Sequence, residues 1–192
     1  SFREFAHTSR PEMLYARSSH AGTYYDNYLY AIGGITYDIE PIEPIYVRDC
    51  ERFNFTLERW EALEPLPQAC YDTSVISLEE TSCLYTLGGS AHYQQLDLIQ
   101  RLRLRDLKWK ILELKLPSPS IYIACFNLNE SQVYFVISKE LFSFTPQTKS
   151  IKTVKSLCGE VSSCYGPCYY FKGALYTSFS AGFSGGVSLG LN

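Results

Sequence analysis

Two stretches decide how this chain folds, Tyr30-Ala31-Ile32-Gly33-Gly34 and Tyr85-Thr86-Leu87-Gly88-Gly89. Each is followed by a tryptophan, Trp60 after the first and Trp109 after the second. The diglycines and the tryptophans both recur after roughly 50 residues, and a period of that length means that one supersecondary unit is repeated along the chain. The pattern therefore predicts an architecture before it predicts a function.

The composition fits a β-rich unit of this kind. The chain has 192 residues, of which 46% are hydrophobic, and its 16 tyrosines and 11 phenylalanines favour strands. No window holds the ~18 uninterrupted apolar residues of a membrane span, which predicts no membrane insertion. The net charge of −3 gives no general attraction to nucleic acid. We therefore expect neither a membrane nor a nucleic acid as partner.

Seven cysteines are scattered along the chain, and their odd number and spacing do not form a disulfide framework. Cys83 and Cys125 lie in apolar runs, where a thiol acts as a small buried hydrophobe. This favours a reducing compartment and predicts a cytoplasmic protein. Two sequons, which begin at Asn54 and Asn129, leave glycosylation in a secreted chain as the alternative.

Each repeated unit is predicted to hold four short strands. The third unit lacks the diglycine and has Ile151 where the tryptophan would stand, and the fourth is cut short. The expected strands are 19–25, 28–32, 50–55 and 60–63 in the first unit, 73–78, 83–87, 99–104 and 109–114 in the second, 121–128, 133–137, 141–144 and 150–154 in the third, and 168–171 and 174–178 in the fourth.

These motifs resemble those of the kelch-repeat β-propeller family. The resemblance is carried by Tyr-x-x-Gly-Gly, by the later Arg59-Trp60-Glu61 and Lys108-Trp109, and by Arg17-Ser18-Ser19-His20 before the first strand. It implies an all-β fold with kelch-type blades of four antiparallel strands, incomplete in this chain. The expected divisions of this one propeller domain are an outer strand of a preceding blade at 1–13, repeats at 14–67 and 68–117, a degenerate repeat at 118–157 and a partial repeat at 158–192.

An incomplete ring of blades has a physical consequence. Sheets that are arranged radially bury one another's faces, so an open arc would expose two apolar blade faces. We expect residues outside this chain, or a partner chain, to complete the propeller.

A search for catalytic chemistry finds no motif. The three histidines form no zinc-type spacing, the spacing of Cys158, Cys164 and Cys168 does not match a zinc ribbon, and there is no nucleophile elbow. We therefore expect no catalytic residue, no metal and no cofactor, and we expect that the chain is not an enzyme.

Two loops are candidates for partner binding. The long segment after the first diglycine contains Tyr37, Asp38 and Glu40, and the segment after the second contains His92 and Tyr93. Long loops on a rigid scaffold often bind partners, although a tolerated insertion explains the first loop equally well.

The family resemblance implies further contacts at the starts of the first strands, where the matching residues are Tyr15, Arg17, Tyr71 and Tyr122. Arg101, Arg103 and Arg105 alternate with leucines, which is typical of the solvated side of an outer strand; the alternative is a stripe that grips an acidic peptide.

The resemblance implies a module that presents its loops to a protein or peptide partner, as a ubiquitin-ligase substrate adaptor or a cytoskeletal scaffold does. Fold alone does not establish this function. Two alternatives stay open. One is a kelch-like enzyme that acts on a small molecule, such as a lyase, oxidase or sugar mutarotase, and the other is a structural set of blades within a larger assembly.

Overall fold

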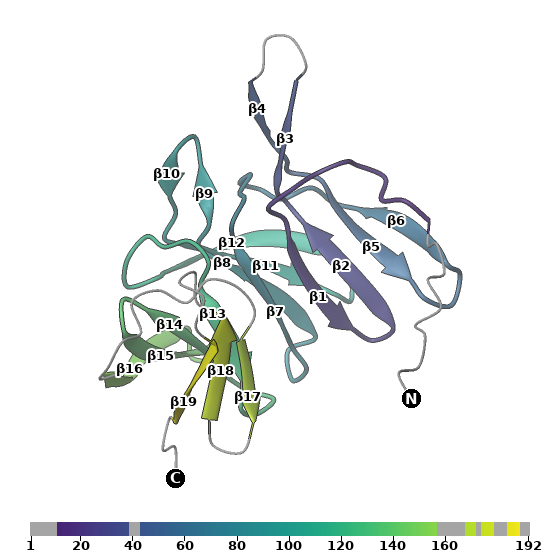
Figure 1. The fold of residues 1–192 in the computed structure, drawn as a ribbon. Coiled ribbons are helices and arrows are strands. Elements are labelled where there is room, and N and C mark those ends of the chain that lie inside the picture. Colours follow the sequence, from purple (N-terminus) through teal and green to yellow (C-terminus); the bar gives the residue numbers. More distant parts are fainter. Residues whose placement is uncertain (1–10, 39–42, 157–167, 172–173, 179–183, 189–192) are drawn as a thin grey trace, which may run out of the picture.

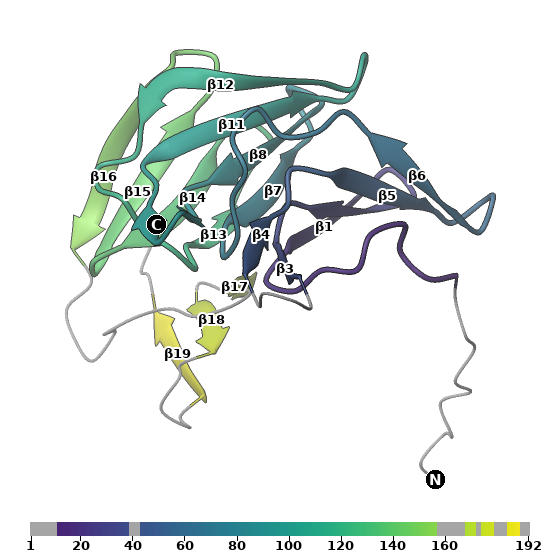
Figure 2. The same cartoon turned by 90° about the horizontal axis from the view of Figure 1, so that it is seen from above.

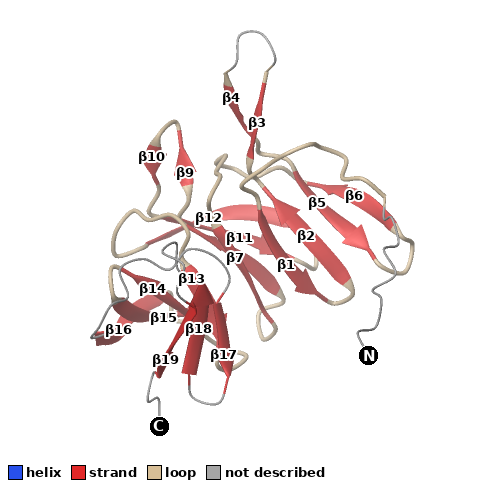
Figure 3. Cartoon of the chain, viewed as in Figure 1, coloured by secondary structure: helices blue, strands red, loops and turns tan. Residues whose placement is uncertain are grey.

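The computed structural model describes residues 11–38, 43–156, 168–171, 174–178 and 184–188, with side chains up to residue 156. All regular structure in the described residues is strand, arranged in several antiparallel sheets (Figures 1 and 3). The predicted all-β class and the four-stranded blades are thus confirmed.

The first blade holds the first diglycine. Its strands are β1 (Ala21–Tyr25), β2 (Tyr28–Ile32), β5 (Cys50–Asn54) and β6 (Arg59–Leu63), and they pair in that order. Asp26 and Asn27 both have positive φ and close the turn between β1 and β2, since short polar residues tolerate this conformation well.

Two further four-stranded blades follow, and then a smaller sheet. Blade 2 is β7 (Ser74–Leu78), β8 (Cys83–Leu87), β11 (Leu98–Arg103) and β12 (Lys108–Lys115). Blade 3 is β13 (Ala124–Asn127), β14 (Val133–Ile137), β15 (Glu140–Thr145) and β16 (Ser150–Ser156). The fourth sheet is β17 (Cys168–Phe171), β18 (Ala174–Ser178) and β19 (Ser184–Ser188), of which β19 had no counterpart in the sequence prediction.

The blades are arranged around a common axis. The first strands β1, β7, β13 and β17 lie next to one another in succession, so each blade presents its first strand to the centre (Figure 2). The last strands β6, β12 and β16 form the outer edge. This is the radial packing of a β-propeller.

Two short hairpins project from the same side of blades 1 and 2 (Figure 1). One pairs β3 (Ile35–Tyr37) with β4 (Pro44–Tyr46), and the other pairs β9 (Ser90–Ala91) with β10 (Gln94–Gln95). The sequence predicts loops at both places, and the structure corrects this. Because each hairpin begins directly after a diglycine, the chain leaves the sheet there.

The diglycines are required by close packing. Gly33 and Gly88 have φ of 63° and 59°, and a Cβ on either would lie within 3.0 Å of a carbonyl oxygen in the linker to the next blade, that of Cys70 or Ser120. Gly34 N and Gly89 N donate hydrogen bonds of 2.9 Å to those same two oxygens. The first glycine thus permits the close approach of the linker, and the second holds the linker through a hydrogen bond.

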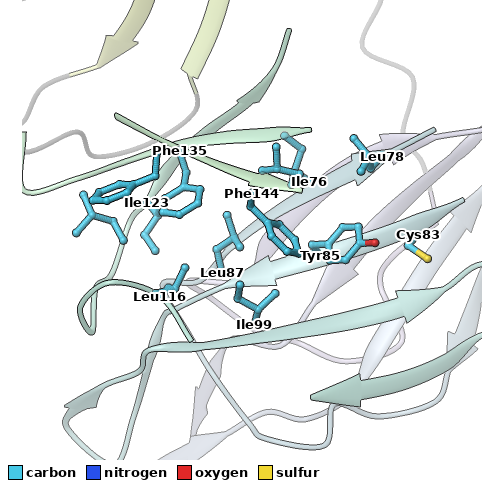
Figure 4. Close-up of a cluster of buried hydrophobic side chains, with 13 residues drawn as sticks. Ile76, Leu78, Cys83, Tyr85, Leu87, Ile99, Leu116, Ile123, Phe135 and Phe144 are labelled. Atoms are coloured by element: carbon cyan, nitrogen blue, oxygen red, sulfur yellow. The ribbon is translucent and has the colours of Figure 1, made fainter. Parts of the chain in front are cut away.

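Apolar clusters fill the spaces between blades. One joins Ile32 of blade 1 with Leu84 and Leu102 of blade 2. The other joins Tyr85 of blade 2 with Phe135 and Phe144 of blade 3 (Figure 4), where Tyr85 and Phe144 meet edge to face at 5.3 Å. Each blade therefore depends on its neighbours to bury its faces.

The pairing register confirms that Ile151 of the degenerate third unit stands where the other units have tryptophan. Trp60 pairs with Phe53, Trp109 with Leu102 and Ile151 with Phe144, so Ile151 does take the place of the tryptophan. Of the strand expected at 1–13, residues 1–10 lie outside the described residues and 11–13 form no strand.

Candidate partner-binding site

The two hairpins are fixed to the blades at their bases. Ser18 and Ile35 form an antiparallel bridge at the start of blade 1, and Tyr71 and Ser90 form the equivalent bridge in blade 2. The segments that precede β1 and β7 are thereby held against the hairpins. The surface that results, which we call the hairpin face, contains residues from both blades.

An aromatic cluster joins the two hairpins. Tyr46 of β4 stacks on Tyr71 with ring centroids 5.7 Å apart and lies 4.5 Å from the ring of His92. Tyr93 meets Tyr46 at right angles, with centroids 6.5 Å apart. We call Tyr46, Tyr71, His92 and Tyr93 the aromatic cluster. It brings together three residues that the sequence analysis had named from separate segments.

Tyr46 lies at the centre of this cluster and was not selected from the sequence. Its hydroxyl is excluded from solvent and has no hydrogen bond of normal length and angle among the described residues. Burial raises the pKa of Tyr46, and the neighbouring Tyr93 and Tyr71 raise it further. The strand-favouring run Ile45-Tyr46-Val47 is the signal that could have indicated a returning strand with Tyr46 beside its base.

His92 and Tyr93 form the tip of the second hairpin in an unusual conformation. Both have positive φ, 48° and 62°, as the two central residues of a turn between Ala91 and Gln94. This turn type favours Asn and Gly, and a bulky side chain in it carries strain. Tyr93 is nevertheless 81% exposed, so the fold holds a large aromatic ring out in solvent at an energetic cost.

Other residues named from the sequence surround the cluster or lie apart from it. Tyr37 and Asp38 are exposed on the first hairpin, while Glu40 lies outside the described residues. Tyr15 is exposed on the segment before β1, and Tyr122, with φ of 51°, lies at the start of blade 3.

Arg17 does not reach the surface, contrary to the expectation of a direct partner contact. Its side chain and that of Glu51 are both 0% exposed and form an ion pair of 2.7 Å. Its guanidinium also donates to the carbonyl oxygens of Gly33 and Asp49. A buried charge requires such partners, so Arg17 fastens the segment before β1 to the blade.

A cavity of about 860 Å³ lies along the first strands of blades 1 to 3. Polar side chains that line it include His20, Asp72 and Ser74. One carboxylate oxygen of Asp72 is excluded from solvent without a hydrogen-bond partner among the described residues. The pKa of His20 is lowered by burial and by the nearby charge of Arg17. The cavity thus holds a solvent-excluded carboxylate oxygen without a partner among the described residues.

Metal-binding side chains do not gather in the part of the chain that the structure describes, where no three His, Cys, Asp or Glu residues form a group. Cys50, Cys70 and Cys83 are buried free thiols. Burial raises the pKa of Cys50 and of Cys70 to about 12, so neither thiol is a nucleophile near neutral pH. Within the described ranges, no helix is long and apolar enough to cross a membrane.

Comparison with known proteins identifies the repeat. The kelch motif model matches residues 16–67. A kelch repeat-containing protein of Dictyostelium discoideum is 30% identical over 89 residues, which cover 45% of this chain and only 13% of that relative. The solved structure of YjhT superimposes with a TM-score of 0.70 at 12% identity, over 88% of this chain and 59% of that chain. This last likeness concerns the fold alone.

Proposed function

Because this chain is a kelch-repeat β-propeller protein, we propose that it is a non-enzymatic interaction module that binds a protein or peptide partner on the hairpin face. The observation that carries the proposal is Tyr93, an exposed aromatic ring held in a strained turn beside three further rings. Strained conformations concentrate at functional sites, and tyrosine is enriched among the residues that dominate binding energy.

The arrangement suits a peptide. Tyr46, Tyr71 and His92 provide an aromatic floor, and Tyr37 and Asp38, on the same hairpin as Tyr46, provide an exposed ring and a carboxylate. Aromatic side chains bury much area at low cost in conformational entropy, and polar groups around them fix orientation. An adaptor or scaffold role in the cytoplasm is the form of this function that the free thiols favour.

We further propose that the ring of blades is completed by residues beyond these or by a partner chain. The larger extent of the YjhT structure, of which this chain covers 59%, supports the proposal. Sedimentation of this chain should then show self-association or aggregation. A stable monomer of the mass of these residues would contradict it.

The test of the binding function uses Tyr93→Gly. Glycine adopts the turn conformation without strain, so the variant should be more stable than the wild type by up to about 1 kcal/mol. Partner binding should nevertheless weaken at least about tenfold, because an anchoring ring is lost. A change that stabilises the fold and weakens binding separates a functional role from a structural one.

The control is Tyr24→Ala, which removes another exposed tyrosine, 59% exposed, at the opposite end of β1, near the turn into β2. Partners recovered with the wild type are measured against both variants by quantitative affinity purification and then by calorimetry with the purified partner. Retention of the partner by Tyr93→Gly at wild-type affinity would contradict the proposal.

A further inference from the structure

A second cleft lies between blades 2 and 3, away from the hairpin face. It has a volume of about 240 Å³ and contains three cationic side chains, Arg101 of β11, Lys110 of β12 and Lys149 of the turn between β15 and β16. Its apolar wall is formed by Leu112, Leu114 and Phe144. The cleft therefore combines concentrated positive charge with a small apolar surface.

These cations lack counter-ions in the described residues. No salt bridge or side-chain hydrogen bond joins Arg101, Lys110 or Lys149 to another described side chain, and the Arg101 Nε atom is excluded from solvent without an acceptor. Glu113 also contributes to the lining but forms no salt bridge with any of the three. A solvent-excluded cationic donor without an acceptor is costly, which points to an anion supplied from outside.

Blade 1 shows how the same position is satisfied internally. Arg52 occupies in blade 1 the place of Arg101, since each is paired in register with the tyrosine of the second strand of its blade, Tyr30 or Tyr85. The residue across from Arg52 on the outer strand is Glu61, whose carboxylate lies 3.0 Å from the guanidinium. That carboxylate accepts hydrogen bonds from both Arg52 and Asn54.

Blade 2 replaces this carboxylate by a cation. The residue across from Arg101 is Lys110, and like charges directly opposite each other destabilise a strand pair. The third cation, Lys149, reaches the same cleft from blade 3. Blade 2 thus keeps the arginine, removes the internal partner and opens a space beside it.

We propose that the cleft between blades 2 and 3 is a binding site for a carboxylate carried on a short apolar group. The carboxylate takes the place that the Glu61 carboxylate has in blade 1 and accepts hydrogen bonds from Arg101, Lys110 and Lys149. The apolar group lies against Leu112, Leu114 and Phe144. A metabolite or a glutamate side chain of a partner can supply this chemistry.

The test titrates the full chain with benzoate and, separately, with N-acetylglutamate amide, by NMR or calorimetry at low salt. Benzamide is the neutral control, because it has the shape of benzoate without the charge. Saturable binding of benzoate or of the glutamate derivative that weakens with added salt supports the site, and the tighter of the two identifies the source. Equal binding of benzamide, or no saturation by either carboxylate up to about 10 mM, overturns it.

Two variants locate the binding. Lys110→Gln should weaken it at least about tenfold, because a charge-assisted hydrogen bond is lost. Lys110→Glu should rebuild the internal pair of blade 1, abolish carboxylate binding and raise the unfolding midpoint by about 2–4 °C. Lys152→Glu, at an exposed site on β16 outside the cleft, is the matched control and should do neither. Undiminished binding by Lys110→Glu overturns the proposal.

Discussion

One buried position is filled in three ways by the three complete blades. On the third strands, Phe53, Leu102 and Phe144 pair with Trp60, Trp109 and Ile151 of the outer strands. The residues two positions before these partners are Glu51, Gln100 and Phe142. Glu51 pairs with Arg17, whereas Gln100 exchanges two hydrogen bonds of 3.0 Å with the backbone of Gln68. Phe142 packs in the apolar cluster between blades 2 and 3.

The four-stranded sheet of a blade and the segments that connect blades depend on different residues. The polar residues Glu51 and Gln100 fasten the incoming segment to a blade whose second strand ends in a diglycine. In blade 3, Ser138 and Lys139 close a tight turn from β14 to β15, and no hairpin is inserted. The four-stranded sheet forms without the diglycine, so the features that blades 1 and 2 share serve the hairpins and linkers.

Removal of one buried charge should have the largest effect. Glu51→Gln leaves Arg17 buried without a carboxylate and should lower the free energy of unfolding by about 3–5 kcal/mol. Urea denaturation measures the change.

The double variant Arg17→Met with Glu51→Leu imitates the apolar solution of blade 3 and should recover most of that loss. A cost below about 1 kcal/mol for Glu51→Gln would show that the ion pair is not needed and that the three solutions are equivalent.

The sequence predicted the blades well because a strand's alternation and its turns are local. The tyrosines of the second strands, the tryptophan register and the place of Ile151 all followed from spacing along the chain. It failed where the decisive contact joins residues that are far apart in the sequence. Arg17 meets Glu51, and Tyr46 meets Tyr71 and His92, across spans that no local period reports.

The same limit applies to the cleft. The stripe of Arg101, Arg103 and Arg105 was interpreted as the solvated side of an outer strand, and Lys110 was not singled out. Only the register shows that Arg101 has the place of Arg52 and that Lys110 has the place of Glu61. Arg103, in contrast, is paired with Asp106.

The diglycine should be the next most sensitive feature of blade 2. Gly88→Ala puts a Cβ against the carbonyl oxygen of Ser120 at a positive φ, so the linker to blade 3 must shift. Overpacking and backbone strain together should cost roughly 2–4 kcal/mol in the free energy of unfolding.

Gly22→Ala is the matched control for this variant. The nearest atom to a Cβ at Gly22 is the Tyr30 carbonyl oxygen at 3.6 Å, an ordinary contact. This variant should leave the free energy of unfolding unchanged or raise it by up to about 1 kcal/mol. Equal losses for the two variants would mean that the diglycine has no special role.

One residue earlier on the third strand, blade 1 has a thiol, Cys50, where blades 2 and 3 have Ile99 and Leu141. Burial raises the pKa of Cys50 to about 12 from 9.0, so the unfolded chain loses this proton first as the pH rises. Its contribution to stability is complete below pH 9 and should fall between pH 9 and about 12, by about 1.4 kcal/mol per pH unit. Cys50→Val should show a correspondingly shallower decline in urea denaturation, and parallel curves for the two proteins would contradict this.

The smallest effect is expected at the turn that replaces the diglycine in blade 3. Ser138 and Lys139 have φ of 49° and 67°, which a glycine adopts more readily than a lysine. Lys139→Gly should therefore raise the free energy of unfolding by about 0.5–1 kcal/mol, measured in urea. The gain should match that of Tyr93→Gly, since both residues are the second of a two-residue turn, but Lys139→Gly should leave partner binding unchanged. Equal losses of binding in the two variants would mean that turn strain as such, and not the exposed ring of blade 2, is what the partner requires.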